Sequence, residues 1–289
     1  MSKRIQCISA ENSMIEFSYD ENADYFLDSL EGVYDVKNSV ITTENTMIDG
    51  SVYQSSRTPG RNIVITALIF SDYKEKRDAV YRVFRKGKPG TFRHIDEDGE
   101  IREITYYAES ILADEKGIVR SMQISLICPD PMFRDPYAET VQMAGWENLF
   151  EFEVEFIDGE PVELTRRRAA QIEVIDYDGT VDEAGMEITI KATATVTNPS
   201  ISHVEQGQTL EIETELEDGE SLRITTGLND KRVYLISSTG EETPADGLIS
   251  EDSEFIQLGL GSNSLQYDAL YGEENMDVTI KYYRLFAAV

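Results

Sequence analysis

The stretch MEITIKATATV, residues 186–196, alternates apolar and polar side chains along its whole length. Met186, Ile188 and Ile190 fall on one side of an extended chain, and Glu187 and Lys191 fall on the other. The two alanines and the valine that follow continue the apolar side. A period of two is typical of a strand with one face in a core and one face in water. The stretch therefore predicts a half-buried antiparallel strand.

The same alternation recurs on both sides of this stretch, in FEFEVEFI (residues 150–157) and LEIETEL (residues 210–216). Turn-forming pairs separate these segments, at Asp158-Gly159, Asp178-Gly179, Asn198-Pro199, Asp218-Gly219 and Thr239-Gly240. Several short strands at such spacing predict a β-sandwich or barrel in the second half of the chain. Glutamates on the solvent faces of the strands account for much of the acidity and discourage edge-to-edge pairing.

Charge is unevenly distributed along the 289 residues, whose 26 basic and 55 acidic side chains give a formal net charge of −29. Residues 1–150 hold 17 basic and 25 acidic residues (−8), residues 151–289 hold 9 and 30 (−21), and residues 51–100 hold 10 and 7 (+3). This shift favours a boundary near residue 140. Prolines at 129, 131 and 136 prevent a helix or a central strand just before it. We predict a first domain over 1–136, a linker over 137–148 and a second domain over 149–289.

The composition also excludes several classes of protein. A pI near 4.3 argues against tight binding of nucleic acid or of an anionic membrane, because both depend on Lys and Arg. No apolar run approaches the ~18 residues of a membrane span, and the N-terminus lacks the apolar core of a secretory signal. Cys7 and Cys128 are too few for a disulfide framework and predict free thiols in a reducing compartment.

The first half of the chain predicts a mixed structure. Residues 62–70 (NIVITALIF) predict a buried strand, and residues 71–87 predict the one helix, with a capping box from Asp72 to Glu75 or a cap at Ser71. Ala79, Val80, Val83 and Phe84 would form its apolar stripe, and Gly87 would end it. Strands are expected over 101–112 and 118–128.

The sequence contains no arrangement of residues that is typical of a catalytic, cofactor-binding or metal-binding site. The two histidines, His94 and His203, fall in different predicted domains and are expected to be structural or surface residues. The segments 96–100 and 176–180 faintly resemble calcium loops but fail the spacing that such loops need, and Asp-Gly hairpin turns explain both. The G-x-G at 259–261 lacks a third glycine and a following helix, so it predicts a loop and not a nucleotide site.

The basic stretch from Arg57 to Arg93 is the one candidate for a charged docking surface. The predicted helix would carry six of its cations on the solvated side: Lys74, Lys76, Arg77, Arg82, Arg85 and Lys86. A solvated face and a docking surface for an acidic partner, or for an acidic copy of the same chain, are both open readings. Trp146, the single tryptophan, is expected to pack at a domain edge, the alternative being a platform for a sugar.

The sequence also resembles a known family, the distal tail proteins (Dit, siphophage tail component) of long-tailed bacteriophages and prophages. In the first half, residues 48–51 (IDGS), 61–65 (RNIVI) and above all 124–133 (ISLICPDPMF) are similar to successive family segments. In the second half, residues 198–201 (NPSI), 219–224 (GESLRI), 258–265 (LGLGSNSL) and 278–284 (VTIKYYR) continue the match. Two departures are the ending Ala287-Ala288-Val289, where the family expects Gly-Val, and the strong acidity of the second half.

The resemblance implies a mainly β protein: an N-terminal tail-tube-like split β-barrel with one flanking α-helix, and a C-terminal galectin-like β-sandwich. It implies a homo-hexameric ring that joins the tail tube to the tail-tip hub in a phage or prophage virion assembled in the bacterial cytoplasm. Implied partners are the major tail protein or tape-measure complex, the tail-tip hub or tail-associated lysin, and receptor-binding proteins. DNA would pass through the ring without specific binding, no membrane insertion is implied, and neither catalysis nor a cofactor is implied.

A closed head-to-tail ring needs two different, complementary patches on each copy. The basic segment 51–100 and the acidic segment 1–50 (3 basic, 10 acidic) could supply them. The hypothesis assigns inter-subunit contacts to Arg57, Arg61, Lys74, Arg77, Arg82 and Arg85, and expects part of 36–60 to be an arm that packs on the next copy. Two other hypotheses are a carbohydrate-binding adhesion module in the C-terminal sandwich, which a glycan array would test, and a hydrolase with dispersed acids, which the poor supply of histidine disfavours.

Overall fold

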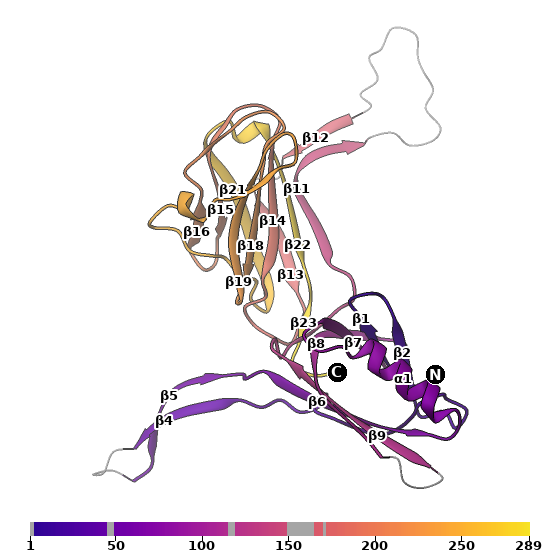
Figure 1. The fold of residues 1–289 in the computed structure, drawn as a ribbon. Helices are drawn as coiled ribbons and strands as arrows, with labels where there is room; N and C mark the ends of the chain where they lie inside the picture. The colour runs from indigo at the N-terminus through magenta and orange to yellow at the C-terminus, as the bar shows by residue number, and fades with distance from the viewer. Residues whose placement is uncertain (1–2, 45–48, 115–118, 149–164, 170–171) are drawn as a thin grey trace, which may run out of the picture. The chain divides into compact units, whose positions relative to one another are not determined.

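The structure is a computed structural model that describes residues 3–44, 49–114, 119–148, 165–169 and 172–289. The chain divides into two compact units. Unit 1 comprises residues 1–136 together with 285–289, and unit 2 comprises residues 137–284. The chain therefore leaves unit 1 after Pro136 and returns to it at Leu285 (Figure 1).

Unit 1 is built on a mixed sheet that closes on itself. The strand order among the described residues is β23-β10-β8-β7-β1-β2-β3-β6-β9, and a further pairing of β8 with β9 turns the path into a split barrel. All pairings are antiparallel except the single bridge between β2 and β3. The strands are β1 (Arg4–Ser9), β2 (Met14–Ser18), β3 (Phe26–Glu31), β6 (Arg61–Ile69), β7 (Pro89–Ile95), β8 (Ile101–Ala113), β9 (Arg120–Cys128), β10 (Phe133–Arg134) and β23 (Leu285–Phe286).

Alternating side chains fill the barrel. In β6, residues 61, 63, 65, 67 and 69 are buried, as the apolar run over 62–70 predicts. Fully buried Phe17, Phe92 and Phe133 lie in the same core, and Cys7 and Cys128 are free thiols within it. Burial raises the pKa of the Cys128 thiol to about 12, so this sulfur stays protonated and unreactive.

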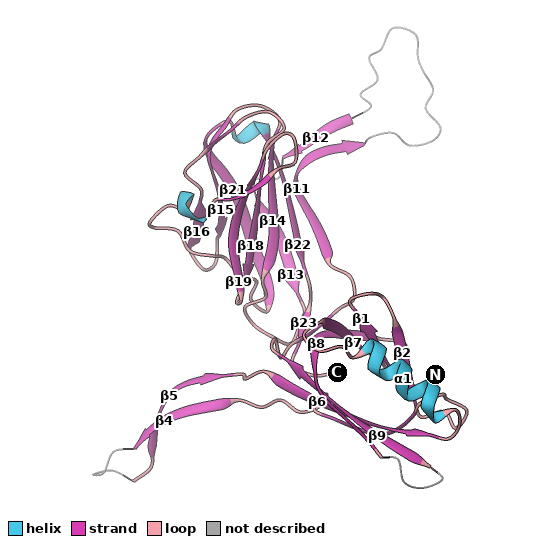
Figure 2. Cartoon of the chain, in the orientation of Figure 1, coloured by secondary structure: helices cyan, strands magenta, loops and turns pink. Residues whose placement is uncertain are grey.

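The single α-helix of the described residues, α1 (Tyr73–Val83), flanks the barrel (Figure 2). Tyr73, Val80 and Val83 are its buried residues, which confirms the predicted stripe. The predicted capping box is wrong. Asp72 occupies the N-cap with a left-handed backbone (φ 52°) and makes no side-chain cap hydrogen bond.

Unit 2 is a sandwich of two antiparallel sheets. The larger has the order β12-β11-β22-β14-β18-β19-β20, and the smaller has the order β13-β21-β15-β16, with β17 paired to β15. The strands of the larger sheet are β11 (Glu139–Asn148), β12 (Thr165–Ala169), β14 (Met186–Ala192), β18 (Ser221–Gly227), β19 (Asp230–Ile236), β20 (Glu242–Pro244) and β22 (Met276–Tyr282). Those of the smaller sheet are β13 (Ile172–Tyr177), β15 (Val196–His203), β16 (Gln208–Glu211), β17 (Glu215–Leu216) and β21 (Gly261–Tyr271). Two 3₁₀ turns, η1 (Asp246–Leu248) and η2 (Glu273–Asn275), complete it.

The alternation in 186–196 is confirmed, with one correction. Met186, Ile188 and Ile190 are buried in β14 as predicted. The strand ends at Ala192, however, and Val196 begins β15 in the opposite sheet, so the stretch crosses between the two layers. Asn198-Pro199 is likewise not a turn: it lies inside β15, where Asn198 (φ 48°) interrupts the pairing with β21.

Residues 137–148, expected to be a linker, contain β11, which pairs with β22 from Glu139 to Ala144. The FEFEVEFI stretch at 150–157 lies outside the described residues. The side chain of Trp146 lies outside them as well, although its backbone pairs with that of Arg167.

Candidate functional site

The most exposed element of unit 1 is a hairpin that extends away from the barrel (Figure 1). It consists of β4 (Ser39–Glu44) and β5 (Ser51–Arg57), which pair only with each other. Every described residue of both strands is exposed. Four apolar side chains are among them, Val40, Ile41, Val52 and Tyr53, with Val52 66% exposed. A two-stranded hairpin is marginally stable by itself in water, so apolar side chains on both strands indicate a surface that binds protein.

The basic face of α1 is partly neutralised by acids of its own unit. Arg85 Nη1 lies 2.8 Å from Glu11 Oε1, and Arg77 Nη2 lies 3.2 Å from Asp78 Oδ1. Lys76 Nζ lies 2.9 Å from Asp24 Oδ1. The pair of Arg85 with Glu11 is exposed on both sides and contributes little to stability, so its exchange for a partner's carboxylates costs little. The Lys76 side chain is only 15% exposed and is the least available of the three cations.

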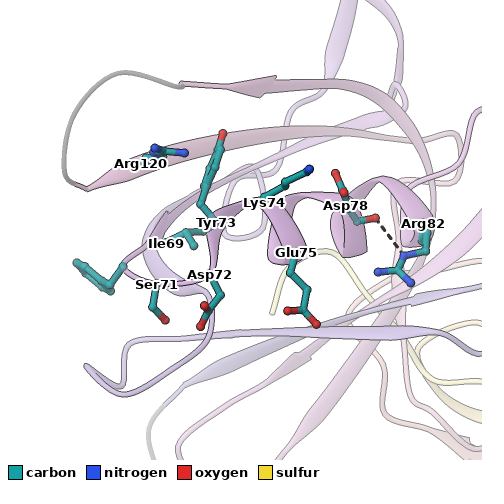
Figure 3. A pocket seen from close by; sticks show the side chains of 10 residues that line it. Ile69, Ser71, Asp72, Tyr73, Lys74, Glu75, Asp78, Arg82 and Arg120 are labelled. Carbon is teal, nitrogen blue, oxygen red and sulfur yellow. Dashed lines mark hydrogen bonds between the residues drawn. The ribbon is translucent and has the colours of Figure 1, made fainter.

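An open cavity of about 710 Å³ lies at the start of α1 (Figure 3). Lys74, Asp78 and Arg82 line it, and the Arg82 Nε–H donates to the backbone oxygen of Asp78 at 3.2 Å. Arg120, from β9, lies over the ring of Tyr73 with 4.5 Å between Cζ and the centroid. Three acids and three bases line this cavity, and this mixture of charges is typical of a polar protein surface.

Among the predicted contact residues, the structure brings Lys74, Arg77, Arg82 and Arg85 together on α1 and the turn that follows. Arg57 lies apart from them, at the end of β5 and exposed. Arg61 is different: it is 8% exposed, and its guanidinium bonds to backbone oxygens inside unit 1. Sequence reasoning grouped Arg61 with the surface cations because its residue type and neighbours give no sign of burial.

The two histidines are internal and lie in different units. Burial lowers the pKa of His94, whose Nε2 lies 3.4 Å from the hydroxyl of Tyr34. His203 Nε2 contacts Asn263 Oδ1 at 3.0 Å.

The segment 96–100 is a turn, in which Asp96 N–H bonds to Glu100 O and Gly99 N–H bonds to Asp96 O. Within the described residues, no three His, Cys, Asp or Glu side chains gather as a metal site would require. In the same part of the chain, no helix has the length and apolar character needed to cross a membrane.

A split barrel with an exposed hairpin, together with a β-sandwich, defines a class of β-rich proteins with two units. Two family models match the chain. The phage tail protein RIFT-related domain covers residues 13–128, and the siphovirus-type tail component C-terminal domain covers residues 178–286. Together they span most of the chain, which belongs to the siphovirus-type tail component (Dit) family. It is a structural component of the phage tail, and not an enzyme.

Solved structures agree with this fold. The Dit protein (gp 19.1) of phage SPP1, described as a paradigm of the hub adsorption apparatus in phages that infect Gram-positive hosts, superposes with a TM-score of 0.66. The match has 12% identity and covers 98% of this chain and 99% of that one. A chain of the phage P2 baseplate in its activated conformation with Ca matches at 9% identity and a TM-score of 0.52, over 100% of both chains. No curated protein sequence matches this chain.

Proposed function

We propose that the chain forms a homo-hexameric ring at the distal end of the phage tail and joins the tail tube to the tail-tip hub. The observation that carries the proposal is the β4–β5 hairpin, whose exposed apolar side chains have no core of their own. In a head-to-tail ring each copy offers one patch and accepts a different one. The hairpin of one copy would supply the first patch and the basic face of α1 on the next copy would supply the second.

Charge supports this pairing. Near its tip the hairpin carries two acids, Glu44 at the end of β4 and Asp49 just before β5. The helix α1 carries Lys74 and Arg82 on its exposed side. Arg57, Arg77 and Arg85 complete the proposed contact set, from which Arg61 is left out because it is internal. The major tail protein or tape-measure complex would lie on one side of the ring and the hub or tail-associated lysin on the other. Receptor-binding proteins would attach to the sandwich.

The acidity also suits a conduit through which DNA passes. A net charge of −29 repels phosphate and so lowers the friction that a basic lumen would cause. Assembly would take place in the bacterial cytoplasm, where the two buried thiols stay reduced.

A hairpin exchange tests the proposal. We expect a variant in which Gly-Gly replaces residues 40–56 to keep the native circular dichroism spectrum of the barrel, because no described side chain of the hairpin belongs to the barrel core. In a phage that lacks the native gene, this variant should yield no tails that carry the protein as a ring in electron micrographs. A matched control is Val204→Asp, which changes an exposed apolar residue of unit 2. Rings formed by the hairpin exchange variant would refute the hairpin contact.

A further inference from the structure

Arg61 lies where the chain leaves the hairpin and enters β6. Its guanidinium is surrounded by backbone oxygens from three separate segments. Nη1 donates to Gly32 O at 2.8 Å and to Asp35 O at 2.9 Å, in the connector that enters the hairpin. Nε donates to Pro131 O at 2.9 Å, and Nη2 donates to Ala287 O. The incoming and the outgoing end of the hairpin are therefore tied to one side chain.

The connector is held by sterics as well. Gly32 has a φ of +81°, and a Cβ at this position would lie 2.0 Å from Asn62 O. Only glycine allows the two backbones to cross so closely. Nearby, the Thr58 hydroxyl donates to Asn38 Oδ1 at 2.9 Å, one residue outside each end of the hairpin. The base of the hairpin is thus fixed from both sides.

The third segment that Arg61 contacts is a strap, residues 285–289, far from the hairpin in sequence. Its first part, β23, pairs with β10, so that Phe286 lies opposite Phe133 and joins the core of unit 1. Arg102 stacks on the Phe286 ring with 3.6 Å between Cζ and the centroid. At the end of the strap, Val289 N–H bonds to Val33 O in the hairpin connector at 3.4 Å.

The geometry of these contacts requires arginine. A guanidinium offers five N–H donors in a fixed plane, whereas an ammonium offers three donors at one point. Burial of this cation is tolerated because backbone oxygens replace water around it. The three segments that supply these oxygens must keep their positions, because the guanidinium loses hydrogen bonds if any of them moves away.

We propose that Arg61 and the strap form a positioning device that fixes the direction in which the β4–β5 hairpin leaves the barrel. Arg61 is the positioning residue, and Ala287 O and Val289 N–H hold the connector from the other side. The positioning stands on these contacts alone. Its consequence for assembly, that the hairpin reaches the neighbouring copy ready aligned, rests on the proposed function.

Distances between spin labels measure the direction of the hairpin. The labels are placed at Val40→Cys on the hairpin and Tyr81→Cys on α1, two exposed positions of unit 1. The native thiols are 0% exposed and do not take up label under native conditions. Two variants test the device: Arg61→Lys, and a truncation that removes residues 287–289 but leaves β23 intact. Arg93→Lys is the matched control, since Arg93 is a partly buried arginine of the same unit that pairs with Glu103, with 2.7 Å between Nε and Oε1, away from the hairpin.

We expect the distance distribution to become at least twofold wider in Arg61→Lys and in the truncation, and to keep its native width in Arg93→Lys. Native width in the folded Arg61→Lys and truncated chains would overturn the proposal, as would equal widening in the control. If Arg61→Lys fails to fold, the truncation alone decides, because it leaves the other oxygen partners of Arg61 in place. Widening without any loss of rings would uphold the positioning device and refute its consequence for assembly, namely that the hairpin must reach the neighbouring copy already aligned.

Discussion

Asn263 organises the loop that precedes β21 through its buried side chain. Its amide nitrogen donates to Gly259 O and Gly261 O, each at 2.8 Å, and to Ile175 O at 3.3 Å. Its oxygen accepts from Gly259 N–H at 2.8 Å and contacts His203 Nε2 at 3.0 Å. Because the nitrogen faces carbonyls, the oxygen must be the acceptor, and the Nε2–H of His203 donates to it. One side chain therefore links β13, β15 and the loop.

Replacement of Asn263 by leucine should destabilise unit 2 by about 3 kcal/mol or more, because buried carbonyls and an N–H lose their partners. Chemical denaturation of the full chain measures the loss. Gln266→Ala on the same strand is the control, since that side chain is half-buried on the other face and should change stability by less than about 0.5 kcal/mol. Equal effects of the two substitutions would contradict the central role of Asn263.

Among the secondary-structure elements, α1 begins after Asp72, and this residue either stabilises the helix as a cap or destabilises it through a strained backbone. A capping aspartate stabilises a helix, and its loss costs ~0.5–2 kcal/mol. Asp72 instead has a left-handed backbone, which costs an ordinary residue roughly 1 kcal/mol and costs glycine almost nothing. We expect Asp72→Gly to leave the stability of unit 1 unchanged or to raise it by up to about 1 kcal/mol. Thermal unfolding measures the change in stability, with Ser71→Gly as the control. A clear loss of stability in Asp72→Gly would show that Asp72 does cap the helix.

Strands and the helix were predictable where one periodicity was uninterrupted. The apolar run at 62–70 gives β6 within a residue at each end, and the helical stripe gives α1, although Gly87 and Pro89 suggested a later end than Val83. The end of β14 was not predictable, because the alternation runs on through Ala194 while the backbone crosses to the other sheet. Ala194 is exposed between the two strands. The alternation therefore predicts which side chains share a face, but not in which of the two sheets they lie.

The candidate site was predictable only in part. Polar composition marked the 36–60 arm, and helical spacing gathered Lys74, Arg77 and Arg82 correctly on α1. The role of Arg61 was not predictable, because its acceptors are backbone oxygens that any residue supplies. Residues 32–35, 131 and 287 come together only through the closed barrel and the returning strap.

At the scale of the whole molecule, charge is the dominant property. Residues 151–289 hold 9 basic and 30 acidic residues, and mutual repulsion among them opposes the folded state. Raising the ionic strength from 10 mM to 150 mM shortens the screening length from about 30 Å to about 8 Å. We expect the melting temperature of unit 2 to rise by about 3 °C. Calorimetry with hydrogen exchange assigns the transitions, and unit 1, whose 17 basic and 23 acidic residues give a net charge of −6, is the internal control. An equal or larger rise in unit 1 would contradict this account.

The return of the chain to unit 1 makes residues 137–284 a removable cassette. The two ends to which it is attached are neighbours, because Arg134 and Leu285 are directly paired between β10 and β23. Recombination could exchange the whole sandwich for another domain with closely spaced ends, and β23, Phe286 and Ala287 would still complete the barrel. A phage lineage could in this way acquire a new second domain in one genetic step without redesigning unit 1.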